Sequence, residues 1–302
     1  HFTIHSFPTR RSSDLGEAGF SIVDAAPLQD PIRVTIQNTG GTASEVVMNG
    51  DRIYIANGES GLAIYDISPP ETPTAVSHLA TPAHAQDIAV IGDIVYLGDG
   101  TDVLRLLDVT DPTTPRMSGA VDLNGGGGAI AVSGSIIGIL EGASTLRLLD
   151  VMTPASPLDL GSFTELTSGE DVFTTPTHAY VAEGLNGLTI IDITTPEAPA
   201  RISSLDTPGT ASAVFISGDH AYLADGEAGL FIADVSTPTA PQSVASFDTN
   251  GTAVSVTVSG DYAYVADSEG GVTIVNVADP GTPSLGSTIG DIPSDAIDVA
   301  VS

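Results

Sequence analysis

Short apolar segments recur along the chain, and clusters of Gly, Pro, Asn and Asp separate them. In the stretch 212–250, the segments SAVFIS, HAYLAD, LFIADV and QSVASFD are separated by GD, GEAG and STPTAP. Segments of this length with alternating or continuous hydrophobic residues, bounded by turn residues, predict four short β-strands. Because proline has no N–H to donate to a sheet, the proline-containing segment must connect the third strand to the fourth.

The same unit repeats at a fixed spacing of 42 residues. Its clearest marker is a stretch of the type (L/V)xIxD, which ends at Asp24, Asp66, Asp108, Asp150, Asp192, Asp234 and Asn276. A second marker is a tyrosine in the second segment, present as Tyr54, Tyr96, Tyr180, Tyr222 and Tyr264. Because each tyrosine stands in an apolar segment, we expect it to pack between units. Gly138 interrupts the tyrosine series, so the unit at 127–167 is the most divergent.

A period of 42 residues with four antiparallel strands is typical of a β-propeller blade. We therefore predict an all-β fold, a seven-bladed β-propeller. Six complete blades are expected at about 43–82, 85–124, 127–167, 170–208, 211–250 and 253–290. The seventh is expected to be split between the termini, with its inner strand at 295–302 and its third and fourth strands at 16–40, and to lack one strand, the second.

The repeat resembles a known family. Its consensus, AVxISGDxAYVADGxxGLxIxDVSxPxxP, is similar to the LVIVD repeat and, more distantly, to YVTN-type propeller repeats. The resemblance covers residues 16–302 as a single domain. It implies a β-propeller and an association with exported or cell-surface proteins, and it implies no particular activity.

Residues 1–15 stand outside the repeat. Within them, residues 5–15 (HSFPTRRSSDL) resemble the translation of a short-read sequencing adapter. The segment lacks the apolar core of a signal peptide and contains Asp14. We therefore expect residues 1–15 to be a non-native addition in a metagenomic or draft-genome fragment, and the natural protein to extend upstream of Gly16.

Charge limits the choice of partners. The chain has 38 Asp and Glu against 8 basic residues, all of them Arg, and a net charge of −30. Such a charge repels nucleic acid and anionic membranes, and it favours cations, neutral glycans or basic proteins. The absence of cysteine excludes disulfides and thiolate metal sites. Apolar runs are too short for a transmembrane helix, and the family resemblance favours an extracellular or cell-surface location.

Two sets of carboxylates recur with the repeat. The first set begins the inner strands and consists of Glu45, Asp87, Asp171 and Asp298. Since these strand ends should meet at one mouth of the channel, they predict a cation site, with Ca²⁺ as the possible ion because it prefers oxygen ligands. The second set lies mainly in the turn between the second and third strands and, with one histidine, predicts an acidic binding face: His84, Asp99, Glu141, Glu183, Asp225, Glu227, Asp267 and Glu269. Asp and Gly at such turns also suit tight hairpins without any ligand.

The most regular carboxylate is the Asp that ends each (L/V)xIxD stretch. It precedes a proline-containing turn, where a short side-chain oxygen can accept a backbone N–H, and Asn276 can do the same. We therefore predict a structural role for this position. The sequence contains no catalytic motif in a supporting context, so no catalytic residue or cofactor is predicted.

These observations favour a non-enzymatic, exported or cell-surface binding scaffold that uses one acidic face of the propeller. Two alternatives remain open. The first is a propeller enzyme, either a lactonase-like hydrolase or a polysaccharide lyase, with a metal in the channel. The second is a propeller module of a larger adhesion protein. An enzyme should place different polar side chains at one channel mouth, whereas a scaffold can keep near-identical blades.

Overall fold

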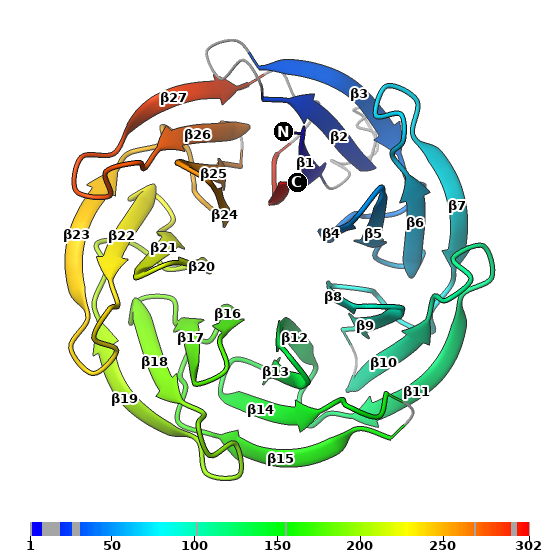
Figure 1. Ribbon diagram of the computed structural model, residues 1–302, viewed down its shortest axis with the longest axis horizontal. Helices are drawn as coiled ribbons and strands as arrows, with labels where there is room; N and C mark the ends of the chain where they lie inside the picture. Colours follow the sequence, from blue (N-terminus) through cyan, green and yellow to red (C-terminus); the bar gives the residue numbers. More distant parts are fainter. Residues whose placement is uncertain are drawn as a thin grey trace.

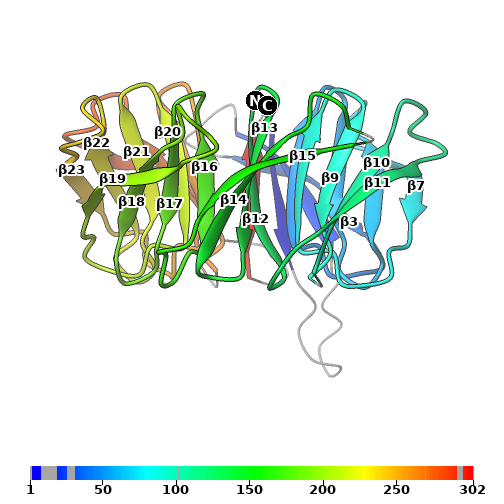
Figure 2. The ribbon, with the colours of Figure 1, turned by 90° about the horizontal axis from the view of Figure 1, so that it is seen from below.

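The described part of the chain is built from strands arranged radially around a central opening (Figures 1 and 2). The computed structural model describes residues 2–7 as backbone, together with 19–25, 31–100, 102–154, 156–268, 270–290 and 295–301. These residues contain no helix, and therefore no helix that could span a membrane. The fold is therefore an all-β propeller, as the repeat predicted.

Six blades each consist of four consecutive antiparallel strands. Blade I contains β4 (Glu45–Asn49), β5 (Arg52–Ala56), β6 (Leu62–Asp66) and β7 (Thr74–Leu79); blade II contains β8 (Asp87–Ile91), β9 (Ile94–Gly98), β10 (Val103–Asp108) and β11 (Arg116–Asp122). Blade III contains β12 (Gly127–Ser133), β13 (Ile136–Glu141), β14 (Thr145–Asp150) and β15 (Leu158–Phe163). Blade IV contains β16 (Asp171–Thr174), β17 (His178–Ala182), β18 (Leu188–Asp192) and β19 (Ala200–Leu205). Blade V contains β20 (Ala213–Ser217), β21 (His220–Ala224), β22 (Leu230–Asp234) and β23 (Gln242–Phe247); blade VI contains β24 (Ser255–Ser259), β25 (Tyr262–Ala266), β26 (Val272–Asn276) and β27 (Ser284–Ile289).

The turns explain why each unit folds in the same way. Between the first and second strands of most blades, a two-residue turn begins with a glycine at positive φ, as at Gly92 (φ 57°) and Gly218 (φ 57°). This backbone conformation matches the twist of a hairpin and costs glycine little. The register then shifts in every pairing of a third strand with a fourth, as between Ile64 and Tyr65 of β6. Such a bulge increases the local twist between the third strand and the outer strand of the blade.

A further four-stranded sheet joins both ends of the chain in the order β28-β1-β2-β3. Its strands are β28 (Asp298–Val301), β1 (Phe2–Phe7), β2 (Gly19–Asp24) and β3 (Ile32–Asn38). β1 pairs with β2 on one side, with Phe2 opposite Asp24, and with β28 on the other, with Thr3 opposite Val301. The expectation that this sheet lacks its second strand is therefore wrong, because β1 occupies that position. Pairing with β1 satisfies the N–H and C=O groups along the facing edges of β2 and β28.

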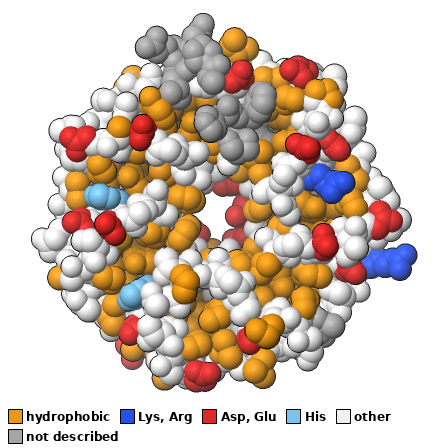
Figure 3. Space-filling model, in the orientation of Figure 1, with side chains coloured by type: hydrophobic (Ala, Val, Ile, Leu, Met, Phe, Trp, Pro, Cys, Tyr) orange, Lys and Arg blue, Asp and Glu red, His pale blue; other side chains and the backbone are white. Residues whose placement is uncertain are grey.

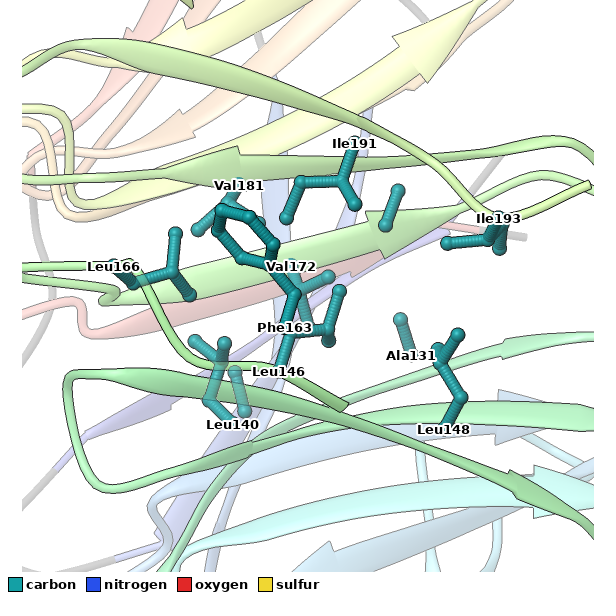
Figure 4. Close-up of a cluster of buried hydrophobic side chains, with 12 residues drawn as sticks. Ala131, Leu140, Leu146, Leu148, Phe163, Leu166, Val172, Val181, Ile191 and Ile193 are labelled. Atoms are coloured by element: carbon teal, nitrogen blue, oxygen red, sulfur yellow. The ribbon is translucent and has the colours of Figure 1, made fainter. Parts of the chain in front are cut away.

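The hydrophobic core is divided into clusters that lie between adjacent sheets. One of them lies between blades III and IV and combines Leu146 and Leu148 with Val172 and Val181 (Figure 4). Equivalent clusters link every adjacent pair of sheets, including the sheet formed by both termini. The repeated tyrosines are 1–5% exposed and lie within these clusters, which confirms their predicted packing role: Tyr54, Tyr96, Tyr180, Tyr222 and Tyr264.

In the divergent blade III, neighbouring side chains fill the space that the repeated tyrosine occupies in other blades. A Cβ built on Gly138 would lie 3.0 Å from Cγ2 of Thr174 and 3.3 Å from Cδ1 of Leu146. Thr174 and Leu146 therefore occupy the space beside Gly138, and a tyrosine side chain would not fit there. Blade III is repacked, which explains how the ring tolerates the exception.

Restoring the repeat residue at this position should destabilise the protein. We expect Gly138→Tyr to lower Tm because the ring would collide with Thr174 and Leu146, with a cost of about 1–3 kcal/mol for overpacking. Thermal unfolding followed by circular dichroism measures the change. The matched control is Tyr180→Phe, which keeps a ring at the equivalent position and should change Tm far less. An unchanged or raised Tm for Gly138→Tyr would show that blade III holds unfilled space.

Candidate functional site

The first strand of each sheet faces a central channel, and acidic side chains are visible around its opening (Figure 3). The cavity has a volume of about 670 Å³. Strand β16 shows how the lining arises, because Asp171 and Phe173 are half-buried whereas Val172 and Thr174 are buried. Alternate residues of an extended strand point to opposite sides, so one set faces the channel and the other packs between blades.

The four predicted channel carboxylates meet in this cavity. Glu45, Asp87, Asp171 and Asp298 each begin an inner strand and line the cavity. Surrounding protein raises the pKa of Asp87 to about 6 and that of Asp171 to about 7, mainly through desolvation, and the charges of the other carboxylates add to the effect. The same desolvation raises the pKa of Glu45 well above its usual value and raises the pKa of Asp298. The four residues that the sequence selected therefore line the same cavity, around the ring.

Each of these carboxylates also links its blade to the next. The Glu45 carboxylate accepts the N–H of Ile88 at 3.2 Å, and the Asp87 carboxylate accepts the N–H of Ile130 at 3.0 Å. Asp171 accepts the N–H of Val214 at 2.8 Å, and Asp298 accepts that of Val46 at 3.0 Å. The last bond joins the C-terminal strand to blade I. Side chains that line the channel therefore also bind the inner strands to one another.

Glu45 and Asp87 begin the inner strands of adjacent blades, and their carboxyl groups influence each other. Desolvation is the main cause of the raised pKa of Glu45, and the negative charge of Asp87 raises it further. Oδ1 of Asp87 is buried, and no N–H or O–H donor reaches it from elsewhere in the described residues. A cation beside the two groups would offset the repulsion between their negative charges. The pair is therefore a point of excess negative charge in the channel.

The remaining positions of the channel differ from blade to blade. Blades III and V carry Ala129 and Ala213 where the other blades have an acidic or hydroxyl side chain, and blade VI carries Ser255. Two residues further along the inner strands, Phe173 and Phe215 face each other edge to face, with ring centroids 5.3 Å apart. The channel is therefore acidic at one end and aromatic on one side.

The expected metal site is not visible as a set of ligands. In the part of the chain that the structure describes, no three His, Asp or Glu side chains are grouped closely enough to hold one ion together. The carboxylates are spread around the ring, each held by the neighbouring strand. Ca²⁺ at the channel mouth stays a prediction.

The carboxylates predicted for the exposed acidic face lie mostly inside the molecule. Five of them are no more than 6% exposed: Asp99, Glu141, Glu183, Asp225 and Asp267. This corrects the expectation that they crowd one surface. Of the remaining members, His84 and Glu227 are exposed, and Glu269 lies outside the described residues.

These buried carboxylates anchor the loops that enter each blade. Asp225 accepts the hydroxyl of Thr207 at 2.6 Å, and Asp267 accepts that of Thr249 at 2.7 Å. Asn57 accepts the hydroxyl of Thr39 at 2.7 Å in the same way. The sequence signal that could have identified this role is a threonine 18 residues before the acidic position. The repeat pattern alone does not distinguish a buried carboxylate from an exposed one.

The divergent turns use arginine instead of threonine. Asp99 pairs with Arg105, and Glu141 pairs with Arg147 at 2.8 Å. Arg147 also donates to the backbone carbonyl of Asp122, the last residue of β11 in blade II. Glu183 combines both solutions, because it accepts bonds from Thr167 and lies 3.2 Å from Arg201. These arginines neutralise buried charge at the turns.

The Asp or Asn that ends the (L/V)xIxD stretch has the predicted structural role in blades I to VI. Asp66 accepts the N–H of Ser68 at 2.8 Å, and Asp234 accepts that of Ser236 at 2.8 Å. Asn276 makes the equivalent bond to Ala278 at 3.0 Å. A neutral amide oxygen thus serves as well as a carboxylate, so this position needs no charge.

Comparisons with known proteins agree on the architecture. The LVIVD repeat model matches residues 40–81, 82–123, 170–207, 208–249 and 250–289 and passes over the divergent blade III. No curated protein sequence matches the chain. A protein of unknown function from Desulfotomaculum acetoxidans has a similar structure, with a TM-score of 0.80, 14% identity and coverage of 99% of this chain and 98% of that one.

Two further solved structures are similar at low identity. The periplasmic gluconolactonase of Pseudomonas aeruginosa has a TM-score of 0.78 and 14% identity, with 99% of this chain and 98% of that chain covered. Apo AztD from Citrobacter koseri has a TM-score of 0.70 and 13% identity, with 99% and 97% covered. Likeness at this level of identity shows the fold alone.

The raised pKa values predict how stability changes with pH. An acid with a folded-state pKa above its unfolded value loses stability as pH rises from the unfolded value to the folded one, here up to about 7 for Asp171. We therefore expect Asp171→Asn to be more favourable, relative to wild type, at pH 8.5 than at pH 5, by about 3 °C in Tm. The lost hydrogen bond affects both conditions equally. Differential scanning fluorimetry at the two pH values measures this difference, and an equal shift at both would contradict it.

Proposed function

Because the chain belongs to the LVIVD-repeat family, we propose that it is a non-enzymatic binding scaffold whose acidic channel takes a positively charged ligand. One observation carries the proposal: the four inner-strand carboxylates and Glu170 line a cavity of about 670 Å³ whose described lining contains no Arg, Lys or His. Desolvation is the main cause of the raised pKa values of the four inner-strand carboxylates, and neighbouring negative charges add to it for Glu45, Asp87 and Asp171. A cation in the channel relieves the repulsion and keeps the groups ionised.

The ring supports this role by holding its lining rigidly. We propose that the sheet formed by β28, β1, β2 and β3 acts as a seventh, split blade that closes the channel. We also propose an exported or cell-surface location, which the family resemblance favours; the structural neighbour from Pseudomonas aeruginosa is described as periplasmic. A closed ring with fixed carboxylates needs little rearrangement on binding.

The gluconolactonase among the structural neighbours shares the architecture of this chain, and this likeness is its only support for the enzyme alternative. An enzymatic channel needs a nucleophile or a metal with adjacent acid–base groups. The described lining offers the carboxyl pair of Glu45 and Asp87 but no grouped metal ligands. The structure therefore favours binding over catalysis as the role of the channel.

Cation binding is measurable with two simple probes. We expect Ca²⁺ or putrescine to bind at pH 8 in isothermal titration calorimetry, with at least about tenfold weaker binding at pH 5, because protonation removes the attracting charge. The pH range follows from the pKa values of about 6 for Asp87 and about 7 for Asp171. The double variant Asp87→Asn with Asp171→Asn should lose most of the binding at pH 8.

The control variant removes equal charge from outside the channel. Glu71→Gln with Glu197→Gln changes two exposed residues in the outer turns and should bind both probes like the wild type. Equal loss of affinity in the two double variants would show a diffuse effect of net charge and would count against a channel site. If neither probe binds the wild type at pH 8, the proposed function is wrong.

A further inference from the structure

One side of the channel differs from the rest in carrying aromatic rings. Phe173 and Phe215 lie on the inner strands of blades IV and V, line the cavity and are half-buried. Their edge-to-face contact, with ring centroids 5.3 Å apart, holds the two rings in a fixed relative orientation. Each ring also packs on a core cluster behind it, which fixes the ring from the rear. Two large apolar rings open to an acidic cavity are not needed to close the fold, since the other blades use smaller residues there.

A carboxylate lies next to this aromatic wall. Asp171 stands two residues before Phe173 on the same strand and the same side, about 7 Å away along the backbone. Its oxygens accept the N–H groups of Val172 at 2.7 Å and Val214 at 2.8 Å, so the side chain is held in one position. Each carboxylate oxygen retains a free acceptor direction. The charge is therefore fixed beside the rings.

Small residues leave space around this carboxylate. Ala213 follows it around the ring in blade V, and blade III contributes Ala129 and Ala131 on the other side. The other arc of the same layer holds Glu45, Asp87, Ser255 and Asp298. Small side chains therefore flank Asp171 in both neighbouring blades.

This chemistry suits an organic cation better than a metal ion. A hard metal ion needs several oxygen ligands at short distance, and the described residues offer no such group. Aromatic rings attract weakly hydrated cations such as alkylated ammonium groups through the negative charge of the ring face. A cavity of about 670 Å³ also exceeds the needs of a single ion.

We infer that the channel binds a small N-methylated or quaternary ammonium compound, with its cationic group beside Asp171 and its apolar substituents against Phe173 and Phe215. This inference rests on the proposed function, because it names the ligand class of the same channel. The rings select for methylated nitrogen, and the carboxylate selects for charge. Neutral molecules of the same shape are rejected because they leave Asp171 uncompensated.

Choline and its neutral carbon analogue, 3,3-dimethyl-1-butanol, form a matched pair of probes. In isothermal titration calorimetry at pH 8, the wild type is expected to bind choline and to show no heat with the neutral analogue. The double variant Phe173→Leu with Phe215→Leu keeps apolar volume but removes both rings, and it should bind choline about tenfold more weakly. Asp171→Asn should lose affinity to a similar or greater extent.

The control is Phe247→Leu, which removes a ring from the outer strand β23, outside the cavity lining, and should leave choline affinity unchanged. Circular dichroism and Tm of each variant establish that the propeller is intact. Undiminished choline binding in the phenylalanine double variant overturns the inference. Binding of Ca²⁺ or putrescine without choline binding overturns it as well and leaves the proposed function standing. Absence of binding for every cation overturns both.

Discussion

Each sheet of this protein has two apolar faces, and each face can be covered only by the neighbouring sheet. The core is accordingly divided into clusters that lie between sheets, and the last cluster joins blade VI to the sheet formed by both termini. Burial of apolar surface thus stabilises the fold only if the ring is complete. Every other feature depends on this closure, because it fixes the radius at which the inner strands meet and hence the spacing of the carboxylates that line the channel.

Much of this structure follows from the fixed repeat. A spacing of 42 residues predicted the blades, and the apolar second strand predicted that Tyr96 and Tyr264 lie between them. Position within the repeat also predicted that Asp87 and Asp171 share the channel, because strand ends at the same repeat position meet on one side of a ring. Periodicity was informative wherever the role of a residue is the same in each blade.

The sequence was less informative where the role of a residue depends on a partner that differs from blade to blade. Asp225 is buried because Thr207 donates to it, and Glu141 is buried because Arg147 pairs with it, so the same repeat position uses different partners. Strand β1 could not be predicted because its residues match no repeat, and its place follows from the two unpaired strand edges that it joins. The aromatic wall was missed because Phe173 and Phe215 are two exceptions in a pattern of small residues, and their proximity depends on adjacent blades.

The equal length of the units has a consequence for how such a protein can change over generations. Blade boundaries fall at the same repeat position, and each carboxylate of the inner ring bonds to the inner strand of a neighbouring or nearby sheet, as Glu45 does to Ile88 in blade II. Unequal recombination between repeats would therefore add or remove whole blades with intact junctions. Such an event would alter the width of the channel and its density of negative charge in one step. A change in blade number would therefore also change the size of ligand that the channel accepts.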